Sequence, residues 1–164
     1  VVVGNEAIFR NEQTPESLAQ KITIVRDLLK ELNLNDVQLT TAEITSAYEN
    51  QKLIDAVDFL LPNIHVFFDG YTPIQAPGWF FAKYQRLSNL VASQNKTVVV
   101  GEVGWPSAGE PFQQGSLSVP SIANAKFFLN AFACEANRIG IPYFYFDAFN
   151  SDYKQVPHSS EYHW

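Results

Sequence analysis

Two stretches of the sequence follow a run of valines with a glycine and then a glutamate. VVVGNE at the start of the chain carries Glu6, and TVVVGE carries Glu102. Short β-branched runs are typical of strands that are buried on both faces, so each carboxyl group is expected where such a strand ends. Two carboxyl groups that meet in one site can act as a pair: one protonates a leaving oxygen, while the other attacks carbon or activates water. This is the chemistry that breaks glycosidic bonds.

The rest of the chain alternates between helical and strand patterns. Apolar residues at steps of three and four predict a helix over 14–34, with Thr14 as its N-cap and Pro15 in its first turn. Further helices are predicted over 51–60, 78–94 and 121–140, and further strands over 36–44, 63–71, 97–105 and 142–149. Together with the first strand, this predicts an α/β fold with parallel strands.

Two parallel architectures fit this alternation, an open doubly wound sheet and a (β/α)₈ TIM barrel. The open sheet typically binds ligands through a glycine-rich phosphate loop, and the sequence contains no such motif. A barrel instead gathers functional side chains at the ends of several strands. Polar side chains are expected at every strand end here: Asn5, Glu6, Glu43, Asp69, Glu102, Asp147 and Asn150. The barrel is therefore favoured, although a complete one needs eight strands and about 250 residues.

Composition and charge exclude several classes of partner. The net charge of -6 argues against a nucleic acid or an anionic membrane surface, and no apolar run reaches the roughly 20 residues of a membrane span. The histidines lack the spacing of metal ligands, and the single cysteine, Cys134, lies in a helical pattern and is predicted to pack in the core. We therefore expect neither a metal nor another cofactor.

The two glutamate motifs also resemble those of a known family. V-V-V-G-N-E-A at 1–7 and G-E-V-G-W-P-S at 101–107 are similar to the signature strands of glycoside hydrolase family 17, the (β/α)₈ enzymes of plants and fungi that act on β-1,3-glucan. The resemblance covers essentially the whole chain. It implies that residues 1–164 are a partial catalytic domain, the strand 4 to strand 8 portion of the barrel. Barrel strands 1 to 3 would then be needed to complete the fold.

The resemblance also implies the roles of individual residues. Glu6 matches the acid/base and Glu102 the nucleophile of a retaining double displacement, which ends in hydrolysis or transglycosylation. Such a mechanism expects the two carboxyl groups about 5 to 5.5 Å apart. Asn5 matches a donor to the sugar 2-hydroxyl, although it is also a possible strand-end cap. Looser matches suggest further substrate-binding residues: Asn63, Phe67 or its neighbour Phe68, Trp105, Asp147 and Lys154.

Some features leave the details open. Trp105 is equally compatible with a sugar platform and with sealing the rim of the barrel. Asn150, Ser151 and Tyr153 depart from the family pattern after the last strand, so no substrate-binding role is carried over to them. The resemblance implies a β-glucan oligosaccharide or polysaccharide as substrate, and an extracellular or cell-wall location.

Two other functions compete with the enzyme. One is a catalytically idle glucan-binding or structural cell-wall protein on the same scaffold, and the presence of both glutamates argues against it. The other is an unrelated parallel α/β binding domain, which would require both motif matches to be accidental.

Overall fold

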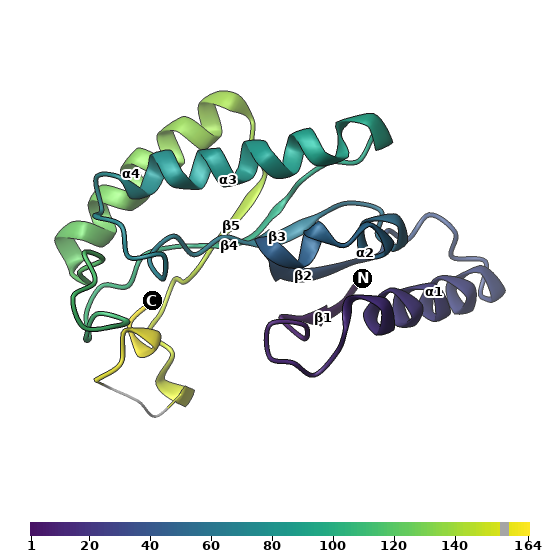
Figure 1. Ribbon diagram of the computed structural model, residues 1–164, viewed down its shortest axis with the longest axis horizontal. Helices are drawn as coiled ribbons and strands as arrows, with labels where there is room; N and C mark the ends of the chain where they lie inside the picture. The colour runs from purple at the N-terminus through teal and green to yellow at the C-terminus, as the bar shows by residue number, and fades with distance from the viewer. Residues whose placement is uncertain (155–157) are drawn as a thin grey trace. The chain divides into compact units, whose positions relative to one another are not determined.

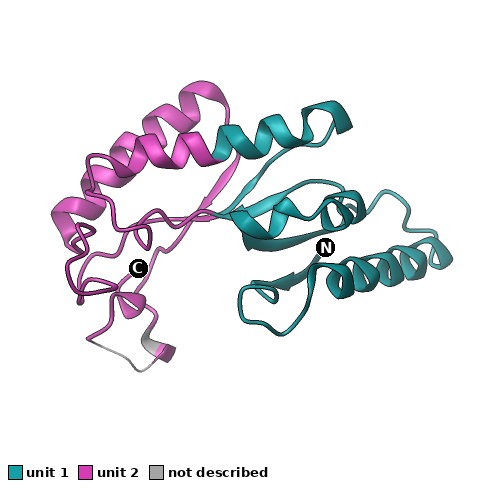
Figure 2. Cartoon of the chain, in the orientation of Figure 1, with its two compact units in different colours: residues 1–63, 84–101 teal, residues 64–83, 102–164 magenta. Residues whose placement is uncertain are grey.

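The computed structural model describes residues 1–154 and 158–164, which fall into two compact units (Figure 2). Unit 1 comprises residues 1–63 and 84–101, and unit 2 comprises residues 64–83 and 102–164. Helices and strands alternate along the chain (Figure 1): β1 (Val2–Asn5), α1 (Pro15–Glu31), β2 (Thr40–Ile44), α2 (Gln51–Ala56), β3 (Leu61–Asn63), α3 (Ala76–Val91), β4 (Val100–Val103), α4 (Ile122–Ile139) and β5 (Tyr143–Tyr145). Short 3₁₀ turns cover Thr45–Glu49, Ala92–Gln94, Asp152–Lys154 and Ser160–Tyr162.

The five strands form one sheet and are hydrogen-bonded in the order in which they occur in the chain. β1 pairs in parallel with β2, β2 pairs in parallel with β3, and a parallel bridge joins Leu60 to Val98 just before β4. The predicted α/β class with a parallel sheet is therefore confirmed. Within the described residues, no helix is both long enough and apolar enough to cross a membrane.

β1 contains a register shift just before the first glutamate. Val2 lies opposite Thr40 and Asn5 lies opposite Ala42, so β1 fits one more residue than β2 into the same interval. Gly4, with φ of 91°, supplies the left-handed backbone that such a bulge requires. Because a bulge changes which way the following side chains point, it decides the direction of Asn5 and Glu6.

The core of unit 1 lies between the sheet and three helices: α1 and α2, which pack against each other, and the part of α3 that carries Leu87 and Val91 (Figure 1). Leu18 and Ile22 of α1 are buried one turn apart, as the helical spacing predicts. The predicted start of α1 is confirmed as well. Thr14 accepts a hydrogen bond from the Ser17 N–H at 3.1 Å, and Pro15 is the first helical residue.

Tyr48 joins two strands in the middle of this core. Its buried hydroxyl donates to the Thr41 carbonyl at 2.6 Å and accepts from the Leu61 N–H at 3.2 Å. Burial raises the pKa of the Tyr48 phenol, so the hydroxyl keeps the proton that it donates. Tyr48 thus satisfies one group on β2 and one on β3.

Replacement of Tyr48 by phenylalanine is expected to lower the free energy of unfolding by about 1–3 kcal/mol, because the Leu61 N–H loses its hydrogen bond to the hydroxyl in a dry environment and the Thr41 carbonyl keeps only the longer one from the Thr40 hydroxyl among those described, at 3.4 Å. Chemical denaturation measures this change. The matched control is Tyr84→Phe, since the Tyr84 hydroxyl donates a longer hydrogen bond, of 3.4 Å, to the Val98 carbonyl and makes no other among the described residues. A loss at Tyr48 no larger than the loss at Tyr84 would contradict the prediction.

The core of unit 2 is aromatic and centred on α4. Phe128, Phe132 and Ala136 are buried at steps of four, and the Phe132 ring lies 4.7 Å from the rings of Phe80 and Tyr143. The prediction that Cys134 packs in the core is wrong, because its side chain is exposed. Two residues advance a helix by about 200°, so Cys134 lies on the opposite face from Phe132 and Ala136.

Two further expectations about the strands are wrong. The strand predicted over 63–71 lies at Leu61–Asn63, and hydrogen bonds from the N–H of Phe68 and Asp69 back to His65 and Val66 form turns in its place. β1 was expected to be buried on both faces, but Val2 is 49% exposed. Among the described strands, β1 lies at an edge of the sheet and has β2 as its one neighbour. Val100 and Val103 of β4 are buried, as expected.

Candidate active site

Glu6 lies immediately after β1 and is held by a side chain from the end of β3. The Asn63 amide donates to Glu6 Oε1 at 3.0 Å and to Asn5 Oδ1 at 3.1 Å. Asn63 is only 3% exposed, so water competes weakly for these hydrogen bonds. The structure thus brings together three of the predicted site residues: Asn5, Glu6 and Asn63.

The glycine that precedes the second glutamate makes room for Asn63. A Cβ atom built on Gly101 would lie 2.7 Å from Asn63 Oδ1, which is too close for a side chain, and 3.1 Å from Leu61 Cγ, which is tight. Because Asn63 is buried and already hydrogen-bonded, it has little freedom to move away. This glycine is therefore needed for packing around Asn63.

A third carboxyl group lies beside Glu6 in unit 1. Glu43 of β2 is completely buried, and its Oε1 accepts a hydrogen bond from the Ile8 N–H at 2.9 Å. Burial raises the pKa of the Glu43 carboxyl group, and the charge of nearby Glu6 acts in the same direction. The sequence places Glu43 at a strand end, but sequence reasoning assigns it no role.

Glu102 in β4 has a histidine as its partner in unit 2. His65 Nε2 lies 3.0 Å from Glu102 Oε2, and the two side chains are 12% and 24% exposed. An ionised carboxylate only accepts hydrogen bonds, so the histidine donates. His65 Nδ1 is buried with no hydrogen-bond partner among the described residues, so the contact of Nε2 with Glu102 is the hydrogen bond that the described structure gives this ring.

Aromatic rings fix the orientation of this histidine. The rings of Phe68, Phe146 and Trp164 surround His65, the last at a centroid distance of 4.7 Å. Sequence reasoning missed the contact between His65 and Glu102. The available signal is the spacing N-I-H, which puts His65 just beyond the end of β3.

The prediction that Phe67 and Trp105 contact substrate is not supported by their burial. Their rings pack edge to face at 5.2 Å and are 0% and 2% exposed, so neither offers an open face to a sugar. The Trp105 indole donates to the Val119 carbonyl at 3.2 Å. This burial favours the alternative interpretation of Trp105, a structural role.

The remaining predicted residues make local contacts. Asp147 is exposed and accepts a hydrogen bond from the Ala148 N–H, and Lys154 forms an ion pair with Glu161 at 2.9 Å. Asp69, expected at a strand end, instead follows a turn and pairs with Lys83 at 2.7 Å. Among the residues that the structure describes, no group of three or more potential metal ligands occurs.

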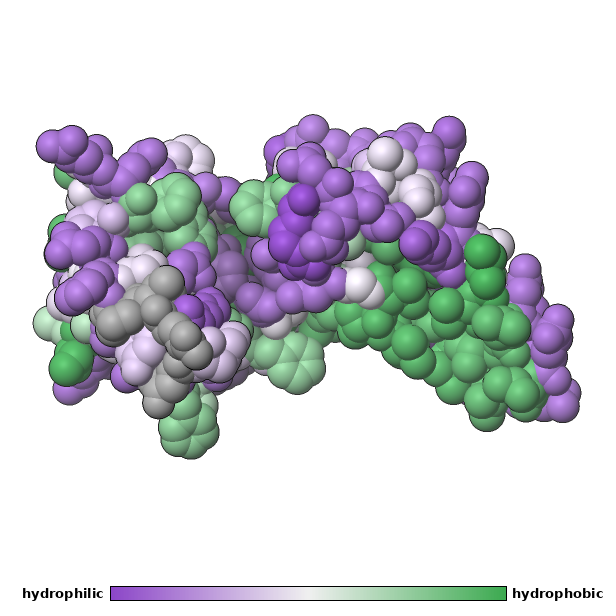
Figure 3. All heavy atoms as spheres, turned by 90° about the horizontal axis from the view of Figure 1, so that it is seen from below, coloured by the Kyte–Doolittle hydropathy of each residue, from purple (hydrophilic) through white to green (hydrophobic). Residues whose placement is uncertain are grey.

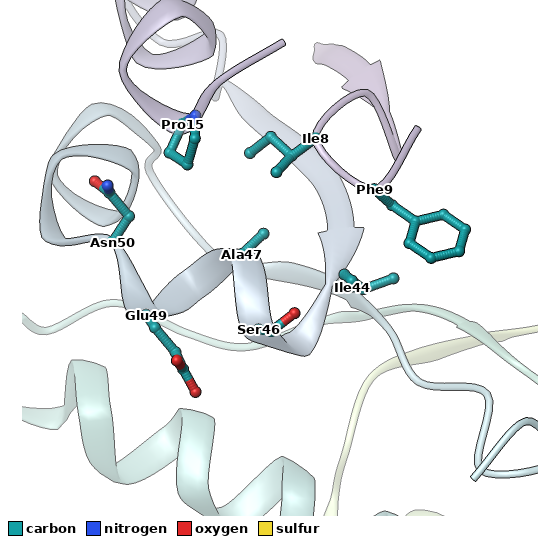
Figure 4. A pocket seen from close by; sticks show the side chains of 8 residues that line it. All are labelled: Ile8, Phe9, Pro15, Ile44, Ser46, Ala47, Glu49 and Asn50. Carbon is teal, nitrogen blue, oxygen red and sulfur yellow. The ribbon is translucent and has the colours of Figure 1, made fainter. Parts of the chain in front are cut away.

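An open hollow of about 500 Å³ lies beside the turn that follows Glu6 (Figure 4). Its lining comprises Ile8, Phe9, Pro15, Ile44, Ser46, Ala47, Glu49 and Asn50. The Asn50 side chain already caps α2 and binds Glu16, while Glu49 pairs with Arg86 at 2.6 Å. The lining surface that is left for a ligand is mostly apolar. The candidate catalytic groups are therefore the carboxyl groups of Glu6 and Glu102 and not the residues of this hollow.

Comparison with known proteins identifies the family. The model of the BtgE/BtgC glycoside hydrolase domain matches residues 1–164. The chain belongs to this family. Relatives of this BtgE/BtgC domain include a probable glucan endo-1,3-beta-glucosidase btgC of Aspergillus flavus, 31% identical over 99% of the chain, and a glucan 1,3-beta-glucosidase of Saccharomyces cerevisiae, 32% identical over 99% of the chain. The chain spans 25% and 56% of the lengths of these two relatives.

Solved structures agree with the family assignment. The domain is similar to a glycoside hydrolase family 17 β-1,3-glucanosyltransferase from Rhizomucor miehei, with a TM-score of 0.84 and 29% identity, covering 99% of the chain and 57% of that protein. A β-1,3-glucanase from Cryptomeria japonica pollen shares the fold with a TM-score of 0.75 at 19% identity, covering 99% of the chain and 66% of that protein.

Proposed function

We propose that this BtgE/BtgC domain carries both catalytic carboxyl groups of a retaining enzyme that acts on β-1,3-glucan. The observation that carries the proposal is that the glutamates of both motifs lie at or beside strand ends, each with a buried or half-buried polar partner. Glu6 has Asn63 and Glu102 has His65. The names of the relatives and of the glucanosyltransferase structure support β-1,3-glucan as the substrate.

In the proposed reaction, Glu102 attacks the anomeric carbon while Glu6 gives its proton to the glycosidic oxygen, and the leaving sugar departs. Glu6, now ionised, then takes a proton from water or from a sugar hydroxyl. The oxygen of that acceptor attacks the anomeric carbon and releases Glu102. Asn5 is proposed to donate to the 2-hydroxyl of the reacting sugar.

We also propose that the chain forms strands 4 to 8 of a (β/α)₈ barrel, in which strand 3 lies next to β1 and strand 1 next to β5. The share of the Rhizomucor miehei structure that the chain covers supports this. So does an apolar surface on unit 1 (Figure 3). Exposed side chains of Val1, of Val2 in β1, of Ile24 and Leu28 in α1, and of Leu32 just after α1 contribute to it.

The full-length protein tests the activity directly. Incubation with laminari-oligosaccharides, followed by mass spectrometry, is expected to give products other than the input. Shorter products alone indicate hydrolysis, and products longer than the input indicate transglycosylation. Binding without any product would favour the idle glucan-binding protein. We also propose that the enzyme is located outside the cell or in the cell wall. Cell fractionation tests this location by showing which fraction contains the protein.

Replacement of His65 by phenylalanine is expected to lower kcat/KM by about 10- to 100-fold, because a hydrogen bond to a charged group is lost while the ring packing is kept. Trapping with an activated 2-deoxy-2-fluoro glycoside, which labels the nucleophile, should slow by a similar factor. His65→Gln retains an N–H donor and should recover part of the loss. Wild-type trapping in His65→Phe would contradict the role of His65.

A further inference from the structure

The buried carboxyl group of Glu43 faces the backbone of the turn that begins with Glu6. Glu43 is 0% exposed, and its Oε1 accepts the Ile8 N–H at 2.9 Å. Its Oε2 is buried as well and has no hydrogen-bond partner among the described residues. A buried carboxyl group with one oxygen unsatisfied is costly, so a stabilising or functional reason is needed for it.

The turn that Glu43 contacts has an unusual backbone. Glu6 has φ of 53°, in the left-handed region that side chains other than glycine seldom adopt. Its own N–H donates to the Ala42 carbonyl at 2.8 Å, and its carbonyl accepts from the Arg10 N–H at 2.9 Å. Two consecutive residues of β2 therefore hold this turn. The Ala42 carbonyl accepts from the Glu6 N–H at the start of the turn, and the Glu43 side chain accepts from the Ile8 N–H two residues later.

The surroundings of Glu43 favour its uncharged form. Burial is the largest influence and raises the pKa of the carboxyl group, and the charge of Glu6 adds to it. The backbone N–H groups of Ile8, Phe9 and Ala7 act in the opposite direction, because they stabilise the carboxylate. An uncharged acid keeps one oxygen as an acceptor for Ile8 and needs no buried counter-ion.

We infer that Glu43 is a positioning residue: by accepting the Ile8 N–H, its carboxyl group holds the turn in the conformation that aims the Glu6 side chain. The inference rests on the proposed function, in which Glu6 is the acid/base. The Asn63 amide binds the Glu6 carboxyl group directly, whereas Glu43 binds the backbone of the turn that carries Glu6. Loss of Glu43 should therefore weaken proton transfer and leave nucleophilic attack by Glu102 intact.

Two substitutions in the full-length protein separate these effects. Glu43→Met keeps the approximate volume and removes the acceptor, whereas Glu43→Gln resembles the uncharged acid and keeps an acceptor oxygen. Glu43→Met is expected to lose about 10²-fold in kcat/KM on laminari-oligosaccharides, within the range that general acid–base catalysis contributes. Glu43→Gln should stay within about threefold of wild type. The control is Glu31→Met, a surface glutamate of the same unit that lies away from the hollow, which should match wild type.

The second readout is a substrate with a dinitrophenyl leaving group, which departs without a proton. The initial burst with this substrate should change less than about threefold in Glu43→Met, since Glu102 is unaffected. Equal losses on both substrates, or a Glu43→Gln variant as impaired as Glu43→Met, would overturn the inference. If Glu43→Met does not fold, Glu43→Asp is used instead, because its shorter side chain moves the carboxyl group away from the Ile8 N–H without adding volume. The losses on the two substrates are then compared in the same way.

The outcomes that would contradict the proposed function differ from those that would contradict the role of Glu43. If wild type makes no product from glucan, or if Glu6→Gln shows no dependence on the leaving group, the assignment of Glu6 itself is wrong. If wild type and Glu6→Gln behave as expected and Glu43→Met is fully active on glucan, only the role of Glu43 is wrong.

Discussion

Replacement of Glu102 by glutamine is expected to lower kcat on β-1,3-glucan by about four orders of magnitude or more, as removal of a nucleophile does in other enzymes. Glutamine conserves the volume of the side chain and can still accept a hydrogen bond from His65, but it cannot form the covalent glycosyl intermediate. The thermal unfolding transition should therefore stay close to that of wild type. Steady-state rates and a melting curve of the same preparation measure the two effects.

The matched control is Glu110→Gln. Glu110 lies in the same unit and is exposed, so its substitution should leave turnover unchanged. Labelling by a 2-deoxy-2-fluoro glycoside followed by peptide mass spectrometry gives an independent check, because the label should be found on Glu102 and disappear in Glu102→Gln. Turnover of Glu102→Gln close to that of wild type, or a label on another residue, would refute the assignment.

Replacement of Glu6 by glutamine is expected to slow cleavage of natural glucans by about 10²–10⁴-fold, the range for loss of a general acid–base group. Formation of the glycosyl intermediate from a dinitrophenyl glycoside should be nearly unchanged, because this leaving group needs no proton. The difference between the two substrates identifies the acid, whereas a folding defect would lower both rates together.

Glu12→Gln serves as the control for Glu6. Glu12 is a surface carboxylate near Glu6 in the sequence and pairs with Arg10 at 2.8 Å, so neither substrate should respond to its loss. Equal losses on both substrates in Glu6→Gln would mean that Glu6 has a role other than proton transfer.

The fold class could be predicted because it depends on patterns within each segment. The spacing of apolar residues in α1, the capping threonine and the proline that follows it are all local features, and the structure confirms them. The exact strand near Asn63 could not be placed, because one apolar run, L-L-P-N-I-H-V-F-F, contains both the strand and the turns after it. Pairing with the neighbouring strands β2 and β4 decides where that strand ends.

The site could be predicted only in part, for a related physical reason. Glu6 and Glu102 stand out through their motifs, but the contacts of Glu43 and His65 depend on which residues of different segments lie opposite each other. The bulge at Gly4 changes the register just before Glu6, and no periodic pattern reveals it. The burial of Phe67 and Trp105 could not be predicted either, because it depends on how distant segments pack. Their aromatic character suggests a sugar platform, whereas packing encloses both rings.

The tight fit of Gly101 against Asn63 limits which substitutions homologous sequences can accept at these two positions. Because the buried amide that binds Glu6 occupies the space where a side chain at position 101 would begin, the two positions are not free to vary separately. A lineage that gains even alanine at position 101 would first have to exchange Asn63 for a smaller residue, and with it give up the hydrogen bond to the acid. Positions 63 and 101 are therefore expected to covary among homologues, and a change at both should accompany a loss of catalytic activity.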